Sequence, residues 1–123
     1  MKEISIYIPK HDLDRVSEIL EKHNVGGFSF YEINGAGRTR REPVPEMVHT
    51  YMTGRMIIPE HAKRTKVEVI VSDSASNQIV ADLLNGLGQH AGTEAHGMIF
   101  VKDVSDACEI GTEQRGEAVL SRK

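Results

Sequence analysis

Glycines and arginines cluster around residue 36 in a pattern that suits the binding of an anion. The run Gly35-Ala36-Gly37-Arg38 is followed by Thr39 and Arg40, and Arg64 lies further along the chain. Arginine presents a planar set of donors that matches carboxylates and phosphates with two parallel hydrogen bonds. Residues 38–66 carry a net charge of +4, whereas the rest of the chain carries −7. This charge asymmetry predicts recognition of an anion by the middle of the chain.

The arginines belong to a long connecting segment, which is predicted to extend over about 36–64. It has no sustained hydrophobic period, and connections this long in a small domain are normally functional or disordered. Methionine adapts to varied surfaces, so the segment is interpreted as a recognition arm that a ligand can order. A solvated flexible loop is the alternative, and Met56-Ile57-Ile58 could extend the next strand. The residues predicted to contact a partner are Met47, Tyr51, Met52 and Arg55.

Hydrophobic periodicity predicts the elements that hold this segment in place. Alternation of polar and apolar residues indicates strands over 3–8, 28–33 and 67–71, and the apolar run 97–101 indicates a buried strand. Helical spacing indicates one helix from about Asp12 to His23. A second helix is expected to be capped by Asp73 or Ser74 and to fray near Gly86 and Gly88. A short extended piece near 104–110 and a polar tail over 111–123 complete the chain.

The predicted order is strand, helix, strand, strand, helix, strand, which is a split βαβ unit repeated once. The fold class is therefore α+β, a ferredoxin-like βαββαβ sandwich in which two helices cover one face of an antiparallel sheet. The length of 123 residues suits a single domain over 1–123. The face of the sheet without helices presents Ser5, Tyr7, Glu68 and Ile70, or their alternates. Because this mixture of polar and apolar residues is poorly suited to water, we expect the chain to self-associate across that face.

Composition narrows the class of protein further. The single cysteine, Cys108, favours a reducing cytoplasm, and neither a membrane-spanning run nor a signal peptide is recognisable. Catalytic motifs of the hydrolase, metallopeptidase and Walker types are absent from the sequence, so an enzyme is not expected. The histidines have no metal-ligand spacing, and no metal is expected. A ferredoxin-like nucleic-acid module is an alternative function, although the aromatic strand signature is missing and the body is acidic.

Several segments of the chain resemble the nitrogen regulatory P-II proteins. The resemblance rests on Gly35-Ala36-Gly37-Arg38 before a long loop, and on the segments 66–73, 97–104 and 112–119. It covers nearly the whole chain in the right order. It implies a cytoplasmic homotrimer with ligand clefts between subunits and loops, called T-loops, that reach partner proteins. It also implies sensing of adenine nucleotides and 2-oxoglutarate, and control of targets such as an ammonium transporter or a nitrogen-assimilation enzyme.

The sequence departs from the P-II pattern where the family binds phosphate. Thr39 replaces a glutamine that helps to hold magnesium, and Ala95-His96-Gly97-Met98 replaces a glycine-rich run with a lysine. Glu109 and Gly111 stand where the family has two phosphate-binding arginines. Each charge-assisted hydrogen bond contributes about 1.5–3 kcal/mol. Losing three would turn micromolar binding into roughly millimolar binding, so ATP is not expected in the usual pose.

The resemblance, corrected for these departures, predicts a sensor of a small anionic effector with no tightly bound cofactor. The effector is 2-oxoglutarate or an adenine nucleotide with fewer phosphates, and a sensor of AMP, ADP or bicarbonate is the alternative. Tyr51 matches the position of a modifiable tyrosine without its surrounding motif, so the match is interpreted as accidental. The predicted effector-binding residues are Gly35, Gly37, Arg38, Thr39, Arg40 and Arg64, and weaker nucleotide contacts are assigned to Ser29, Ile70, His96, Gly97 and Met98.

Overall fold

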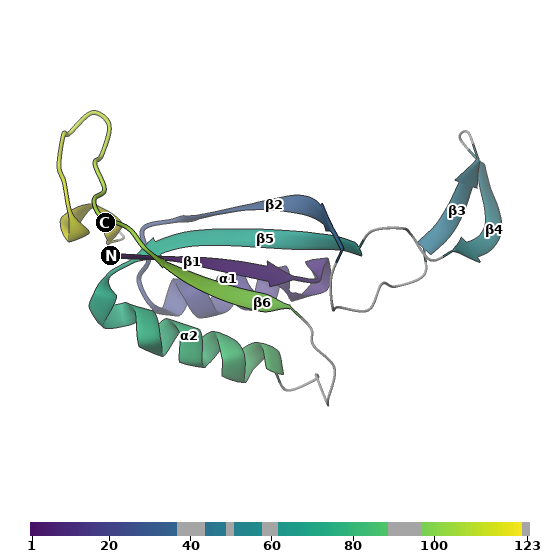
Figure 1. Cartoon of the computed structure of the whole chain (residues 1–123), viewed down its shortest axis with the longest axis horizontal. Helices are drawn as coiled ribbons and strands as arrows, with labels where there is room; N and C mark the ends of the chain where they lie inside the picture. Colours follow the sequence, from purple (N-terminus) through teal and green to yellow (C-terminus); the bar gives the residue numbers. More distant parts are fainter. Residues whose placement is uncertain (37–43, 49–50, 58–61, 89–96, 122–123) are drawn as a thin grey trace.

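Four antiparallel strands form the main sheet, in the order β2-β5-β1-β6 (Figure 1). The structure is a computed structural model that describes residues 1–36, 44–48, 51–57, 62–88 and 97–121. The strands are β1 (Lys2–Ile8), β2 (Phe28–Gly35), β5 (Ala62–Val71) and β6 (Met98–Asp103). Strands β1 and β5, which are the first and third strands of this sheet in chain order, are neighbours. The predicted ferredoxin-like plan requires this pairing. The predicted α+β fold is therefore confirmed.

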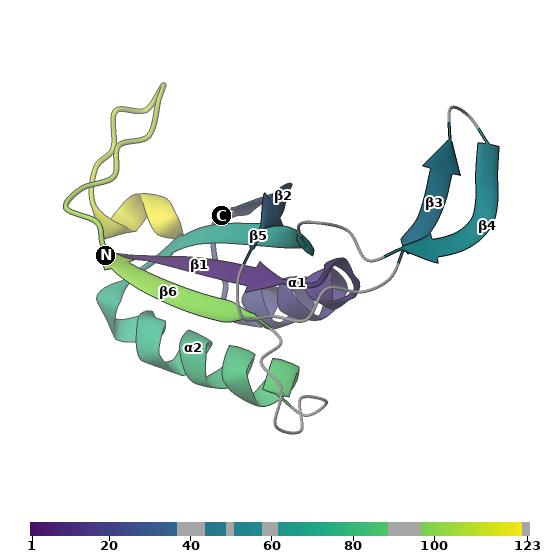
Figure 2. The same ribbon diagram turned by 45° about the vertical axis from the view of Figure 1, so that its right-hand side comes forward.

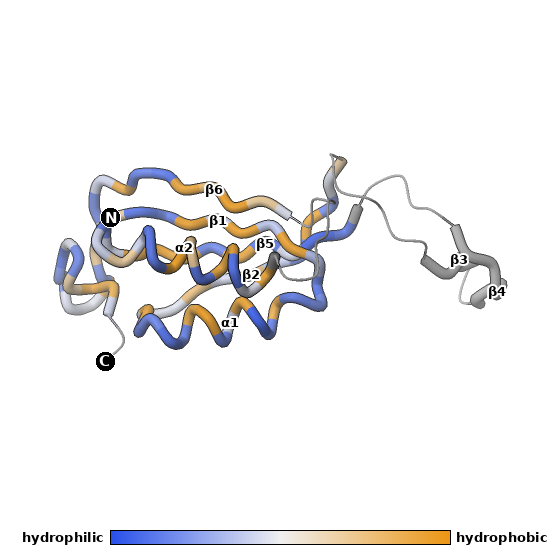
Figure 3. The backbone as a smooth tube through the Cα atoms, turned by 90° about the horizontal axis from the view of Figure 1, so that it is seen from below, coloured by the Kyte–Doolittle hydropathy of each residue, from blue (hydrophilic) through white to orange (hydrophobic). Residues whose placement is uncertain are grey.

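Two helices cover one face of this sheet (Figure 2). Helix α1 (Leu13–Lys22) follows a short 3₁₀ helix, and α2 (Asp73–Gly88) follows β5. Because side chains alternate along a strand, one face of each central strand packs against the helices and supplies buried apolar residues. Figure 3 shows apolar residues along β1 and both helices. The fully buried core is aliphatic and is contributed by β1, β5 and both helices. It is made largely by Ile4, Ile6, Val16, Leu20, Val67, Val69, Ile79 and Leu83.

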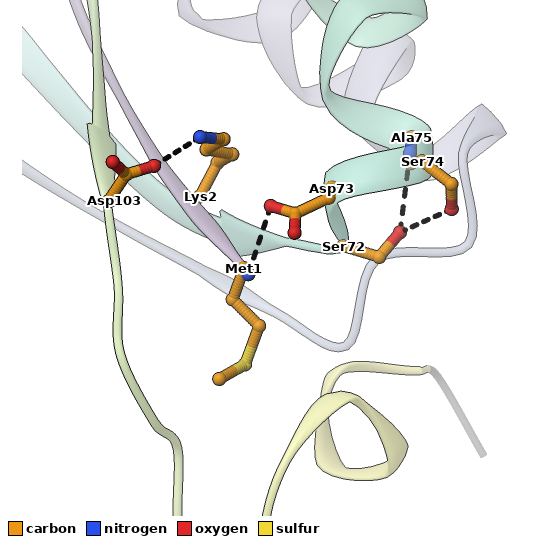
Figure 4. Close-up of polar contacts among 7 residues, drawn as sticks. All are labelled: Met1, Lys2, Ser72, Asp73, Ser74, Ala75 and Asp103. Carbon is orange, nitrogen blue, oxygen red and sulfur yellow. Dashed lines mark hydrogen bonds and ion pairs between the residues drawn. The ribbon is translucent and has the colours of Figure 1, made fainter.

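The N-terminus of α2 is fixed by polar contacts at one end of the sheet (Figure 4). The Ser72 hydroxyl accepts a hydrogen bond of 3.3 Å from the Ala75 backbone N–H. Ser72 therefore caps the helix, and the prediction of Asp73 or Ser74 as the cap is wrong. Asp73 lies one position inside the helix, where its carboxylate pairs with the terminal amino group of Met1 at 3.0 Å. This pair joins the start of β1 to the start of α2.

A separate two-stranded sheet lies within the long connecting segment. It consists of β3 (Val44–Val48) and β4 (Tyr51–Ile57), which pair with each other in antiparallel register. Figures 1 and 2 show this hairpin beyond the end of the main sheet. The sequence, in which this segment shows no sustained hydrophobic period, did not predict this hairpin. The strands are short and apolar residues occupy adjacent positions in them, so the period of two is hidden in the sequence.

The C-terminal segment folds back on the start of β2. A turn is closed by the Asp106–Arg115 ion pair at 2.6 Å and by an isolated bridge between Cys108 and Arg115. A short 3₁₀ helix (Glu117–Leu120) follows, and Leu120 accepts a hydrogen bond of 2.7 Å from the Gly26 backbone N–H. The segments predicted as an extended piece and a weakly patterned tail are therefore a turn and a docked helix. Within the described ranges, no helix has the length and apolar character that crossing a membrane requires.

Candidate functional site

The base of the long connecting segment brings Gly35 and Arg64 to the same end of the sheet. Gly35 ends β2 and is the register partner of Ala62, while Arg64 on β5 is the partner of Ile33. The Arg64 guanidinium donates a hydrogen bond of 2.8 Å to the Lys63 carbonyl oxygen. The other four residues predicted to bind the effector lie outside the described residues. They are Gly37, Arg38, Thr39 and Arg40.

An open hollow of about 830 Å³ lies over the opposite ends of β2 and β5. Two of the residues predicted to contact a nucleotide, Ser29 and Ile70, line it together. The C-terminal segment forms one wall through residues 119–121. Three carboxylates line this main hollow, and its described lining includes no lysine or arginine. The acidic residues are Glu3, Glu68 and Glu109.

One of these carboxylates, Glu68, is held in its charged form by neighbours on the uncovered face of the sheet. Its Oε1 lies 2.9 Å from Lys66 Nζ and accepts a hydrogen bond of 2.9 Å from the Tyr31 hydroxyl. The hydrogen bond with Lys66 is the main cause that lowers the pKa of Glu68, and the bond from Tyr31 adds to it. A carboxylate with a depressed pKa stays negative at neutral pH, and here Lys66 balances its charge.

Lys66 lies between two tyrosine rings at the centre of the same face. Its Nζ is 5.3 Å from the ring centre of Tyr7 and 5.7 Å from that of Tyr31. Both tyrosines are register partners of Lys66. The hydrogen bond to Glu68 is the largest cause that raises the pKa of Lys66. Sequence reasoning did not find this cluster, because only the register across three strands brings its members together.

Gly97 and Met98 lie at the start of β6, on the opposite edge of the sheet from Ser29. Gly97 allows the chain to pass close to β1, since a Cβ atom there would lie 2.0 Å from the Tyr7 carbonyl oxygen. Met98 is the register partner of Tyr7 and is half exposed. A single chain therefore separates Ser29 on β2 from Met98 on β6 by the two central strands. His96 lies outside the described residues.

The residues predicted to contact a partner all lie in the β3–β4 hairpin, for which only the backbone is described. Met47 is the register partner of Met52, and Val48 is the partner of Tyr51. Arg55 lies on β4 between Met52 and Ile57. The hairpin thus gathers these predicted contacts into one small sheet.

Comparison with known families decides the relationship. The chain matches the family Nitrogen regulatory protein P-II over residues 1–114. The chain belongs to the P-II family. A solved structure described as GlnK of B. subtilis superposes on this P-II chain with a TM-score of 0.70 and 20% sequence identity. The superposition covers 97% of both chains, and at this identity it shows the shared fold.

Membership makes this protein a P-II signal-transduction regulator. P-II proteins are regulators of nitrogen metabolism that bind small effectors and partner proteins, and they are not enzymes. Within the described ranges, no three histidine, cysteine, aspartate or glutamate side chains are grouped closely enough to hold a metal ion.

Proposed function

We propose that this P-II protein senses a small anionic effector and does not depend on ATP bound in the usual family pose. The candidate effectors are 2-oxoglutarate and an adenine nucleotide with fewer phosphates. The observation that carries the proposal is the separation of charge between the predicted effector contacts and the predicted nucleotide contacts. Arginine lies at the base of the long segment beside Gly35, whereas carboxylates line the main hollow beside Ser29 and Ile70.

The acidic hollow supports the proposed weakness of triphosphate binding. Glu109 stands where the family resemblance places a phosphate-binding arginine, and it lines the hollow with Glu68. Glu3 and Glu68 are each paired with a lysine, Lys102 at 3.3 Å and Lys66 at 2.9 Å, so the repulsion of a phosphate falls mainly to Glu109. An adenosine moiety with one or two phosphates meets less of this repulsion than ATP does.

The end of the sheet at Gly35 supports binding of a dicarboxylate. Arg64 is half-buried there, and the chain that carries Arg38 and Arg40 leaves the sheet at the same place. Arginine binds carboxylates through two parallel hydrogen bonds. We assign the effector contacts to Gly35, Gly37, Arg38, Thr39, Arg40 and Arg64.

The positions of Ser29 and Met98 on opposite edges support a site that is completed between subunits. The residues predicted as weaker nucleotide contacts cannot act together in one chain, but edge strands of neighbouring copies can bring them together. We therefore propose a homotrimer with three inter-subunit clefts, in which Ser29 and Ile70 face His96, Gly97 and Met98 of the neighbour. The proposed location is the cytoplasm.

The proposed output is the conformation of the T-loop, the segment of about 36–64. An effector bound at Gly35 and Arg64 stabilises one arrangement of the loop by the difference in its affinity for the two arrangements. The loop then binds or releases a target such as an ammonium transporter or a nitrogen-assimilation enzyme. The target contacts are assigned to Met47, Tyr51, Met52 and Arg55.

Isothermal titration calorimetry tests the proposal. The ligands are 2-oxoglutarate, bicarbonate, AMP, ADP and ATP, each alone and in pairs, with and without magnesium. We expect 2-oxoglutarate, AMP or ADP to bind without ATP, and Arg64→Ala to weaken the anionic ligand while the trimer stays intact. Tight ATP binding that requires magnesium would overturn the proposal, and an unchanged affinity in Arg64→Ala would refute the assignment of Arg64.

A further inference from the structure

Residues 117–121, which we call the C-terminal wall, bound the main hollow without being packed into the core. Val119, Leu120 and Ser121 line the main hollow. Leu120 and Ser121 also line a second hollow of about 380 Å³, which they share with residues that follow α1 and begin α2. The 3₁₀ helix of the wall contains no buried residue. A wall with open space on two sides is held by few contacts, so its position depends strongly on each of them.

Two backbone contacts attach the C-terminal wall to the turn between α1 and β2. The Gly26 N–H donates a hydrogen bond of 2.7 Å to the Leu120 carbonyl oxygen, and Val25 forms an isolated bridge with Ser121. A Cβ atom on Gly26 would lie 2.7 Å from the same Leu120 oxygen and 3.5 Å from the carbonyl oxygen of Ser121. The wall can therefore approach the turn this closely only because residue 26 is a glycine.

The backbone at Gly26 would accept alanine. Neither Gly26 nor its neighbour Gly27 has the positive φ that favours glycine. A Cβ atom on Gly27 would meet no atom within 4 Å. Alanine at position 26 therefore disturbs the contact with the C-terminal wall, whereas alanine at position 27 leaves that contact as it is.

We propose that Gly26 is a positioning residue for the ligand of the main hollow, because it holds the C-terminal wall in place. The inference rests on the function proposed above, which assigns an adenine nucleotide with one or two phosphates to this hollow. Val119 and Leu120 add apolar surface to that of Phe28 and Ile70 in the lining, and apolar surface suits a flat base. A ligand that contacts the sheet and the wall together binds the docked arrangement more tightly than the undocked one. Ligand binding and docking of the wall therefore stabilise each other.

Hydrogen exchange at the Gly26 amide measures the docking in the unmodified protein, because this N–H bonds to the wall. NMR should show exchange at Gly26 that is several-fold slower with saturating AMP than without it, and the same with ADP. The control is the Val104 amide, which bonds to the Met1 carbonyl oxygen at 3.0 Å. Neither residue of this control pair lines the main hollow, so its exchange should not change.

Gly26→Ala tests the positioning role by calorimetry, with Gly27→Ala as the matched control. We expect Gly26→Ala to bind AMP several-fold more weakly than the wild-type protein and Gly27→Ala to bind it equally well. The affinity for 2-oxoglutarate should stay the same in both variants, since its proposed contacts lie at the opposite end of the sheet. An equal loss for AMP and 2-oxoglutarate in Gly26→Ala would show general damage and contradict a positioning role.

The outcomes separate this inference from the proposed function. Nucleotide binding that leaves exchange at Gly26 unchanged would overturn the inference alone, as would equal affinities of Gly26→Ala and Gly27→Ala for AMP. A wild-type protein that binds neither AMP nor ADP would overturn the nucleotide part of the proposed function and this inference with it. The exchange measurement needs no substitution, so it decides the matter even if Gly26→Ala does not fold.

Discussion

The imidazole Nε2 of His23 lies 2.7 Å from Oδ2 of Asp82, and this contact joins the C-terminal end of α1 to the middle of α2. The His23 side chain is largely buried, whereas that of Asp82 is partly exposed. Gln78 donates a hydrogen bond of 2.8 Å to the other oxygen of Asp82. The hydrogen bond with His23 is the main cause that lowers the pKa of Asp82, and Gln78 adds to it.

Asp82→Asn should lower the thermal unfolding midpoint at neutral pH and have less effect in acid. A carboxyl whose pKa is lower in the folded state stabilises the fold fully above its unfolded pKa of about 3.9. This stabilisation is lost as the pH falls through the lower, folded value. Circular dichroism melts between pH 2 and 8 measure the difference, with the exposed change Glu21→Gln as control. Equal midpoints for wild type and Asp82→Asn at every pH would refute the role of this contact.

Gly97→Ala should destabilise the junction between β1 and β6. The added Cβ would lie 2.0 Å from the Tyr7 carbonyl oxygen, so one strand must shift. We expect a loss of about 3 kcal/mol in the free energy of unfolding, measured by urea titration. Gly27→Ala is the control, because a Cβ there meets no atom within 4 Å. Its effect should stay within about 0.5 kcal/mol, and a similar loss in both variants would contradict the steric explanation.

Glu109→Arg should strengthen the binding of ATP. The change removes one of three carboxylates from the main hollow and adds a cation at the position that the family resemblance assigns to phosphate. One charge-assisted hydrogen bond of about 1.5–3 kcal/mol corresponds to a gain of roughly 10- to 150-fold in affinity. Calorimetry measures the gain. Glu113→Arg makes the same change of charge outside the hollow lining, so an equal gain there would show that net charge alone is responsible.

Phe100→Asp should dissociate the proposed trimer without unfolding the chain. Phe100 is half exposed on the uncovered face of the sheet, where its ring packs edge-on against Tyr7 at 5.6 Å. A charge buried in a subunit interface without a partner is strongly unfavourable. Light scattering after size exclusion should show the mass of a single chain for Phe100→Asp and an unchanged mass for Ala81→Asp on the exposed side of α2. A trimeric Phe100→Asp variant would show that this face does not form the interface.

The core strands and both helices could be predicted from the sequence because their signals are local. Ile4 and Ile6 alternate with polar residues, and Val16, Ile19 and Leu20 recur at helical spacing. The structure extends the predicted strands at their ends: β5 begins at Ala62 and β6 ends at Asp103. Those added residues are polar or mixed, and sheet pairing rather than hydrophobic alternation keeps them extended.

The features that sequence reasoning missed depend on contacts between distant segments. Lys66 meets Tyr7 and Tyr31 only because three strands align in one register. The C-terminal helix docks through the backbone of Gly26 and Leu120, which no side-chain pattern reports. Ser29 and Ile70 do line one hollow, as the resemblance led us to expect, but their role in binding stays a prediction.

Gly35 and Ala62 are direct register partners, so the hairpin segment leaves and re-enters the sheet at adjacent positions. An insertion with neighbouring ends places little demand on the sheet, because the entropy of closing a loop grows slowly with its length. The segment can therefore gain, lose or exchange residues while the scaffold stays the same. In this chain, the sequence of the segment can evolve independently of the core that supports it.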